Sequence, residues 1–435
     1  MESSLPIILG IIFLFCFLVG APLFSIIGGA AVVCFSLIDH QSMAAVIIEM
    51  TRLANAPGIT AVPLFIFAGY ILAESKSADR IIRVSNAFVG WIPGGLVIVC
   101  VLVSTLFTAM SGASGVTIIA CGGLLLPTLV KDGYSRNFAM GLITAAGSSG
   151  VLVAPSLPII IYGMIGQVDI TVLFEACAMP AFLIVACLSL TGVTYALWKK
   201  IPTHSFHFKT LFAALWETKW EIPLPFIVLI GIYGGFITVS EAAVSTVVYV
   251  LFSECLMYRE IPMKHLLKIL IDSIITTGSI LMVLGAALGF TNFLVDREIP
   301  QLLLAKMQLA VHSHITFLLL VNAVLLFVGS IMEIFSAIVV VVPLIAPVAI
   351  AYGVDPVHLG VIFLANLELG YLTPPFGINL FISCLRFDAP IMKLYRQVLP
   401  FLAIMIMALL LITYWPRLTT WLVDVLGGRP ALLPM

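Results

Sequence analysis

Hydrophobic segments long enough to cross a lipid bilayer follow one another along almost the whole chain. About 20 apolar residues in a helix span the hydrocarbon core, whereas shorter apolar runs are typical of half-helices and re-entrant hairpins. The first half, residues 1–198, predicts scaffold helices at 5–20, 22–39 and 60–75, an amphipathic surface arm at 77–90, a hairpin at 95–130, a broken helix at 137–164 and a long helix at 170–198. A short polar loop containing Arg52 is expected before residue 60.

The same order of segments returns after a polar connection at 199–221. The second half, residues 222–426, predicts scaffold helices at 222–236, 239–256 and 271–295, a surface arm at 297–311, a hairpin at 314–350, a broken helix at 357–384 and a last helix at 394–424. A basic link with Arg259, Lys264 and Lys268 is expected before the third of these helices. No segment has the composition of a separate soluble domain.

The two halves also share glycine and proline landmarks at a constant separation. Four pairs are each 220 residues apart: Pro127 and Pro347, Gly133 and Gly353, Gly150 and Gly370, Pro155 and Pro375. Each pair falls at the same place in the hydrophobic profile, which indicates an internal duplication. Duplicated hydrophobic halves that are interrupted at equivalent positions are typical of secondary transporters, whose binding sites lie at the interruptions.

Each half contains two polar interruptions within otherwise apolar helices. They lie at 111–115 and 147–156 in the first half, and at 329–333 and 366–375 in the second. An interrupted helix leaves backbone N–H and C=O groups unpaired, which is costly in hydrocarbon unless a neighbour, an ion or water satisfies them. The interruptions are therefore expected to face a filled or aqueous cavity.

Composition indicates an integral membrane protein surrounded by the lipid bilayer. Hydrophobic residues make up 62% of the chain and charged residues 9%, whereas soluble globular proteins carry roughly 25% charged residues. The formal net charge is −1 and no basic stripe is present, so no nucleic-acid partner is expected.

Basic residues are distributed unequally between the two sides of the predicted helices. If the N-terminus lies outside, five of the 20 Lys and Arg residues share its side, namely Arg52, Arg297, Lys306, Arg417 and Arg429, and the other fifteen lie opposite. This bias predicts a cytoplasmic connection at 199–221 and both termini in the periplasm. Each half has an odd number of crossings, so the second is expected to be inverted, with the two hairpin tips approaching near the midplane.

The interruptions offer oxygen ligands for a coupling cation such as Na+, because exposed carbonyls and hydroxyls suit this ion. The predicted Na+ ligands are Ser111, Gly112, Ser114, Gly147 and Ser149 in the first half, and Gly329, Glu333, Glu368 and Gly370 in the second. Small residues in membrane helices also serve close packing alone, which is the structural alternative for each Ser and Gly. Acidic residues at membrane depth are costly and usually functional, although Glu368 could instead pair with a backbone donor.

The predicted substrate site lies between the two cation sites. Half-helix N-termini and side-chain donors suit a carboxylate, and the candidates are Ser148, Pro155, Asn366, Thr373, Pro374 and Asn379. Pro155, Pro374 and Pro375 are expected to hold the breaks open because proline lacks the N–H donor, with a simple kink as the alternative. Glu241, near the start of its helix, is expected to cap that helix or to contact a neighbour rather than to bind a ligand.

Several of these segments resemble the large membrane subunit of tripartite ATP-independent periplasmic (TRAP) transporters, the DctM-like family. The resemblance is carried by Gly329–Glu333, Pro343–Pro347 and Asn366–Leu380, and in the first half by Pro63–Gly69, Ser111–Gly115, Lys131–Tyr134 and Ala154–Ser156. It covers nearly the whole chain, and the motif at 366–380 is its most specific part. The chain departs from the family at Ala154, where a second proline is common, and at 113–116, where Ser-Ser-Pro-Ala is common.

The resemblance implies an all-α polytopic membrane protein with two inverted repeats, re-entrant hairpins and broken helices, of the elevator type found in the ion transporter superfamily. It also implies Na+-coupled import of an organic acid, such as sialic acid or a C4-dicarboxylate, across the bacterial inner membrane. A periplasmic substrate-binding protein and a separate small four-helix membrane subunit are the implied partners.

Three other functions are alternatives to this one. A carrier of the same superfamily that works without a binding protein would share the fold. An intramembrane serine protease is suggested by the GxSG pattern at 112–115, but such a serine needs a nearby base, and all seven His residues are predicted at helix ends or in loops. A passive channel would need a continuous polar lining, whereas the polar groups here cluster at one depth.

Overall fold

The computed structural model describes residues 12, 13, 15, 16, 19–38, 44–56, 58–202 and 206–426, and within these ranges all regular structure is helical. Seven described helices are long and apolar enough to cross a membrane: α7 (Ser114–Lys131), α10 (Ile170–Lys199), α13 with η2 (Val239–Met257), α14 (Met263–Asp296), α16 (His314–Ile331), α17 (Ile334–Ala351) and α20 (Ile391–Tyr414). The all-α polytopic fold is thus confirmed. The helix predicted at 5–20 falls largely outside the described residues.

Both halves present the same series of helices. The first contains α2 (Leu23–Val33), the π-helix η1 (Cys34–Ile38), α3 (Ala44–Ala54), α4 (Ala61–Glu74), α5 (Ser77–Val89), α6 (Gly95–Ser111), α7, α8 (Arg136–Ala146), α9 (Leu157–Gly166) and α10. The second contains α12 (Pro223–Tyr233), α13 (Val239–Val250), the π-helix η2 (Leu251–Met257), α14, α15 (Ile299–Ala310), α16, α17, α18 (Pro356–Gly370), α19 (Ile378–Phe387) and α20, followed by α21 (Arg417–Leu426).

The separation of 220 residues holds in the structure. The hairpin helices α7 and α17 begin at Ser114 and Ile334. Pro180 and Pro400 lie inside α10 and α20 at the same separation. The two halves are inverted repeats, each with a re-entrant hairpin and a broken helix.

Four details of the predicted pattern were wrong. Arg52 lies in α3 and not in a loop, and the connection between the halves contains the amphipathic helix α11 (Phe208–Glu217). Helix α14 begins at Met263 and includes Lys264 and Lys268, because lysine is compatible with a helix that continues beyond the hydrocarbon. The last predicted helix ends at Tyr414, and a new one begins beyond Pro416, which cannot continue a helix.

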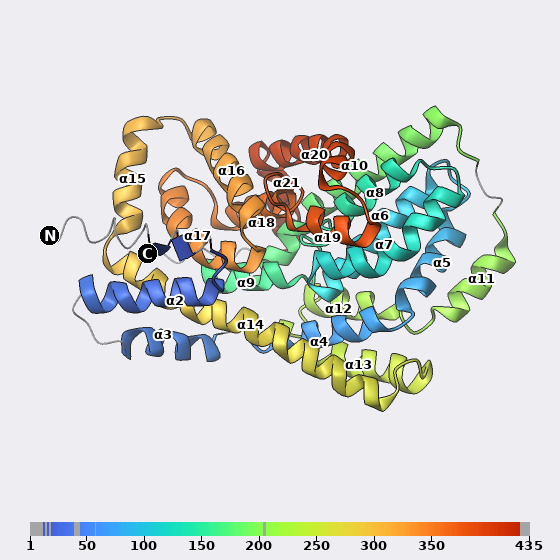
Figure 1. Cartoon of the computed structure of the whole chain (residues 1–435), viewed down its shortest axis with the longest axis horizontal. Coiled ribbons are helices and arrows are strands. Elements are labelled where there is room, and N and C mark those ends of the chain that lie inside the picture. The colour runs from blue at the N-terminus through green and yellow to red at the C-terminus, as the bar shows by residue number, and fades with distance from the viewer. Residues whose placement is uncertain are drawn as a thin grey trace.

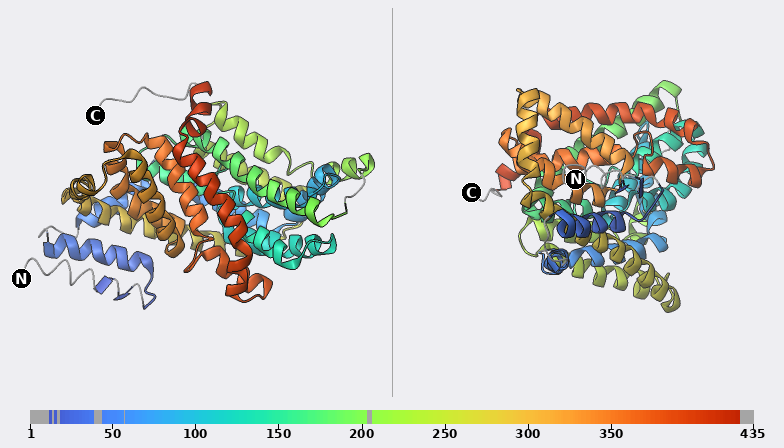
Figure 2. Two further views of the ribbon diagram at one scale, coloured as in Figure 1. Left: turned by 90° about the horizontal axis from the view of Figure 1, so that it is seen from above. Right: turned by 60° about the vertical axis from the view of Figure 1, so that its left-hand side comes forward.

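The helices pack in two layers that Figure 1 shows one above the other. In that view α2, α3, α4, α13 and α14 form a lower layer, and the hairpins and broken helices lie above it. Within the lower layer α2 packs on α14 and α13 packs on α4. Helices α2 and α3 lie at one end of the elongated molecule and α5 and α11 at the other (Figures 1 and 2).

A buried ion cluster joins α5 to the second half. The side chain of Arg80 in α5 is buried and forms ion pairs with Glu221, with Glu254 at 2.8 Å and with Glu260 at 2.5 Å. The guanidinium also lies over the Tyr258 ring, 3.8 Å from its centroid. Burial raises the pKa of Glu221 above its ordinary value, against the opposing effects of Tyr258 and Arg80. We call these four charged residues the Arg80 cluster.

Candidate binding site

Only two residues, Gly112 and Ala113, separate the two helices of the first hairpin. Helix α6 ends at Ser111, Gly112 has a φ of +68°, and α7 begins at Ser114. A positive φ favours glycine, and a Cβ at Gly112 would also overlap the side chain of Leu157, the first residue of α9. The tip of the hairpin is therefore held directly against the start of α9. This half-helix follows the interruption at 147–156, which we call the first break.

A hydrogen bond across the two repeats connects this tip to the second broken helix. Ser114 Oγ donates to Asn379 Oδ1 at 2.7 Å, and Asn379 is fully buried. The Nδ2 group of Asn379 has no partner among the described residues. Helices α8 and α19 are joined nearby, where Thr144 Oγ1 donates to Ser383 Oγ at 2.8 Å. This contact joins Ser114, a predicted Na+ ligand, to Asn379, a predicted substrate-binding residue.

The first break is surrounded by hydroxyl groups, three of which belong to threonines that were not among the predicted ligands. Thr108 Oγ1 lies 2.7 Å from both Thr117 Oγ1 and the carbonyl oxygen of Gly147. Thr105 Oγ1 lies 2.5 Å from Ser149 Oγ. All four side chains are buried. We call Thr105, Thr108, Thr117, Ser149 and the Gly147 carbonyl the hydroxyl cluster.

The hydroxyl cluster fits a hard monovalent cation, because its donor atoms are all neutral oxygens. Two of the predicted Na+ ligands, Gly147 and Ser149, belong to it. Ser148 points elsewhere and donates to the carbonyl oxygen of Ala145 at 3.0 Å. Threonine residues at positions 105 and 108, one turn apart on an apolar helix, were the available sequence signal.

The second break, between α18 and α19, is instead surrounded by close backbone contacts. A Cβ on Gly370 would lie 2.6 Å from the backbone of Gly329, so the end of α18 and the first arm of the second hairpin touch. The N–H of Ile334 donates to the Tyr371 hydroxyl at 2.7 Å, and the N–H of Gly377 donates to the Ser330 carbonyl at 3.1 Å.

The two breaks are chemically unlike despite their common origin. The positions related to Thr105, Thr108 and Thr117 by the repeat are Leu325, Val328 and Ala337, which carry no hydroxyl. Thr373 Oγ1 donates to the carbonyl oxygen of Leu369 near the end of α18. Pro374 is exposed, whereas Pro155 in the first break is buried. The peptide bonds before Pro155 and Pro375 are both cis.

The two acidic candidates occupy different surroundings. Glu333 lies exposed at the N-terminus of α17. Glu368 is fully buried, and neither carboxylate oxygen has a partner among the described residues. The helix that carries it, α18, packs against α16, α10 and α17.

Asn366 points away from Glu368, as expected for helical residues two positions apart. Its Nδ2 donates to Asn322 Oδ1 of α16 at 2.7 Å, and its Oδ1 has no partner in the described part of the chain. Asn322 Nδ2 in turn donates to Thr413 Oγ1 at 3.1 Å, and a His358 ring nitrogen lies 3.2 Å from the Thr413 carbonyl. This buried polar chain links α18 to α16 and α20.

Two further expectations concern single side chains. Glu241 forms a capping box with Thr238 at the start of α13, so its predicted capping role is confirmed. Ser114, the serine of the GxSG pattern, donates to an amide oxygen. An amide is not a general base, so this geometry does not activate the serine as a nucleophile.

Comparison with known proteins identifies relatives of this arrangement. Residues 10–418 match the family model described as the tripartite ATP-independent periplasmic transporter, DctM component. The isethionate TRAP transporter permease protein DctMQ of Oleidesulfovibrio alaskensis is 33% identical, covering 96% of this chain and 66% of that protein. The C4-dicarboxylate TRAP transporter large permease protein DctM of Vibrio cholerae is 32% identical, covering 94% of this chain and 96% of that protein.

Two further matches extend the comparison. The sialic acid TRAP transporter large permease protein SiaM of Vibrio cholerae is 33% identical, covering 85% of this chain and 87% of that protein. Among solved structures, the Alcanivorax borkumensis YdaH transporter, described as having an unusual topology, superposes with a TM-score of 0.58 at 15% identity, covering 84% of this chain and 86% of that one. The latter likeness concerns the fold alone.

Proposed function

Because the chain belongs to the DctM component family of TRAP transporters, we propose that it is the large transport subunit of a Na+-coupled importer of an organic acid. In this proposal a periplasmic binding protein delivers the substrate, and a separate small four-helix membrane subunit lies beside the chain. The protein resides in the bacterial inner membrane with both termini in the periplasm. The relatives' names include isethionate, C4-dicarboxylates and sialic acid, which are all organic anions.

The observation that carries the proposal is the contact between Ser114 and Asn379. It brings the first hairpin tip and the second broken helix together in a buried place and leaves the Asn379 amide N–H groups without a partner among the described residues. A buried donor of this kind is costly unless a ligand satisfies it. A carboxylate oxygen is an acceptor of the required type.

The hydroxyl cluster is the proposed place for Na+ in the first half. Thr105, Thr108, Thr117 and Ser149 would hold the ion through their hydroxyl oxygens, together with the Gly147 carbonyl. Bound there, the ion supplies positive charge near the carboxylate and couples its uptake to the membrane potential. One net positive charge moving through 100 mV contributes about 2.3 kcal/mol, so two Na+ per monoanion would drive accumulation.

The way in which the hairpins and broken helices are joined supports the elevator mechanism that we propose. Ser114 with Asn379 and Thr144 with Ser383 connect segments of both repeats within the upper layer. We expect these segments to move as one unit relative to α2, α3, α4, α13 and α14. The substrate and Na+ would travel with that unit.

The proposal is tested by uptake into proteoliposomes that contain this chain and its small subunit. Labelled organic acids are presented with the binding protein, under an inward Na+ gradient or with choline instead of Na+. We expect saturable uptake that requires both Na+ and the binding protein. Uptake without the binding protein would favour an independent carrier, and uptake that merely follows the substrate gradient would favour a channel.

A matched pair of variants tests the site. Asn379→Ala removes the free amide and is expected to reduce uptake at least tenfold, whereas Asn292→Ala, a half-buried asparagine in α14, is expected to leave it unchanged. Equal uptake by both variants, at equal amounts of inserted protein, would contradict the assignment of Asn379.

A further inference from the structure

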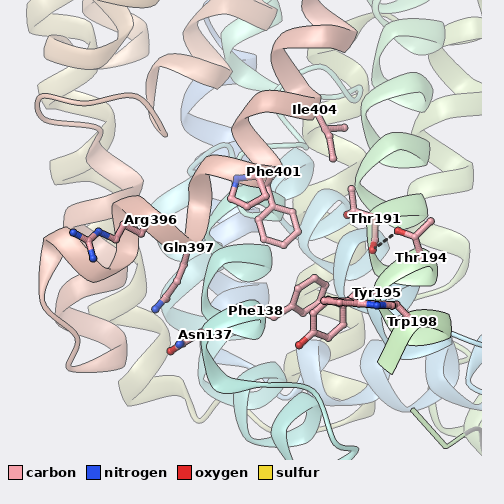
Figure 3. Close-up of a pocket in the computed structure, with 11 residues that line it drawn as sticks. Asn137, Phe138, Thr191, Thr194, Tyr195, Trp198, Arg396, Gln397, Phe401 and Ile404 are labelled. Carbon is pink, nitrogen blue, oxygen red and sulfur yellow. Dashed lines mark hydrogen bonds between the residues drawn. The ribbon is translucent and has the colours of Figure 1, made fainter. Parts of the chain in front are cut away.

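A groove with a cavity volume of about 560 Å³ runs between α10, α20 and the start of α8, away from the interruptions (Figure 3). Along α10 its wall extends from Trp198 to Thr191, and along α20 from Arg396 to Ile404. With a rise of 1.5 Å per residue these walls are about 10 and 12 Å long. We call this feature the α10–α20 groove.

The groove is polar at one end and apolar at the other. Asn137, Arg396 and Gln397 lie near the basic ends of the helices, where α10 finishes at Lys199. Phe401 and Ile404 line the opposite end, as Figure 3 shows. A polar end followed by an apolar end matches an amphipathic molecule that enters the groove from a membrane interface.

Aromatic rings form one wall of the groove. Phe138 and Tyr195 stack with their ring centroids 3.9 Å apart, and the Tyr195 ring lies 6.4 Å from that of Trp198. Tyr and Trp are enriched where membrane helices meet the headgroup region. The composition of this wall is therefore typical of the depth where a lipid headgroup meets its acyl chains.

Positive charge is available at the polar end. Arg396 lines the groove and is exposed, and Lys199 Nζ lies 4.3 Å from the ring centroid of the lining residue Trp198. The side-chain oxygen of Gln397 is buried and has no partner among the described residues. The polar end thus combines cations for an anionic group with an acceptor for a hydroxyl group.

The helix faces beside the groove are those of a lipid-exposed surface. Leu190 and Leu197 of α10 and Leu399 and Met407 of α20 are at least 54% exposed. Large apolar side chains on the outside of membrane helices contact hydrocarbon. A molecule in the groove would therefore lie against the acyl chains of the surrounding bilayer.

We propose that the α10–α20 groove binds an anionic phospholipid with a hydroxyl-bearing headgroup, such as phosphatidylglycerol. Arg396 and Lys199 bind the phosphate, and the Gln397 side-chain oxygen accepts a hydrogen bond from the headgroup hydroxyl. The first carbons of an acyl chain lie along Phe401 and Ile404. This site is separate from the proposed transport site.

Native mass spectrometry of the full chain with its small subunit tests the proposal. Phosphatidylglycerol and phosphatidylcholine with identical acyl chains are added in equal amounts, and inorganic phosphate is added in a separate arm. We expect the complex to retain at least threefold more phosphatidylglycerol than phosphatidylcholine, and phosphate alone not to compete. Equal retention of both lipids, or displacement of the lipid by phosphate, would overturn the proposal.

Variants locate the bound lipid. Arg396→Gln is expected to reduce retained phosphatidylglycerol at least threefold, whereas Lys393→Gln, which removes a cation one turn away on the same helix, is expected to have no effect. Ile404→Trp fills the apolar end and is expected to reduce retention without changing any charge. Equal losses in Arg396→Gln and Lys393→Gln, or retention that disappears when the small subunit is added to the chain, would refute the site.

Discussion

Removing the guanidinium of Arg80 tests how strongly the surface arm α5 is anchored. Its side chain is 4% exposed and neutralises carboxylates from the connection between the halves and from the segment that follows α13. Arg80→Ala would leave three acidic side chains close together without their common partner. An amphipathic surface helix is expected to expose its charged residues, so the hydrophobic pattern of the surface arm did not indicate this cluster.

The size of the expected loss of stability follows from the burial of the three glutamates that pair with Arg80. The side chains of Glu221 and Glu254 are 3% and 0% exposed, and that of Glu260 is 19% exposed. Breaking a buried ion pair by deleting one partner costs about 3–5 kcal/mol. We therefore expect Arg80→Ala to lower the unfolding midpoint by roughly 3–6 °C.

The assay is thermal unfolding of the purified protein in detergent, followed by tryptophan fluorescence. Arg83→Ala is the matched control, because Arg83 lies three residues further along α5 and pairs with Glu217 at 3.3 Å, with both side chains more than half exposed. Exposed pairs of this kind contribute about 0–1 kcal/mol. We expect Arg83→Ala to unfold within about 1–2 °C of the unmodified protein.

The reasoning is refuted if the two variants unfold at the same temperature. Arg80→Lys separates charge from geometry, since an ammonium group keeps the charge but lacks the planar array of five N–H donors. We expect its midpoint to fall between those of Arg80→Ala and the unmodified protein. A midpoint for Arg80→Lys below that of Arg80→Ala would show that the loss of charge is not the main cost.

Further changes test the two breaks. Thr108→Val removes a hydroxyl at nearly constant volume and should raise the Na+ concentration needed for half-maximal uptake, which a Na+ titration measures; an unchanged titration would exclude Thr108 as a ligand. Gly370→Ala places a Cβ against Gly329 and should destabilise the fold by about 1–3 kcal/mol, measured by thermal unfolding. Asn366→Ala and Glu333→Ala should each abolish uptake while membrane fractions contain normal amounts of protein; uptake at the unmodified rate would remove both residues from the site.

The hairpins and broken helices could be predicted because each leaves a mark in the hydrophobic pattern. Apolar runs are interrupted by Gly and Ser at 111–115 and, at equivalent places in the two halves, by Pro155 and Pro375. The structure has turns at these positions. The helix α11 and the first turns of α14 left no comparable mark. Charged and polar residues outside the hydrocarbon are equally compatible with a helix and with a loop, so local sequence does not distinguish the two.

The candidate site could be predicted only in part, because the contacts within it depend on tertiary packing. The interruptions identified Ser114 and Asn379, but their hydrogen bond joins residues 265 positions apart and depends on how the repeats pack. Thr105 and Thr108 were missed because a threonine in an apolar helix can satisfy its hydroxyl on its own backbone. Which way Glu368 and Asn366 face is likewise decided by tertiary packing.

The uninterrupted helix α14 limits how alike the two halves can be. Shifted by 220 residues, its counterpart is the pair α3 and α4, which is divided between Ala54 and Ala61, whereas α14 continues through 34 residues. Such a rod is about 51 Å long, longer than the hydrocarbon is thick, and it cannot bend where its counterpart does. The two repeats therefore cannot simply exchange their conformations. In the proposed elevator mechanism, we expect the resting populations of the inward-open and outward-open forms to be unequal even without substrate.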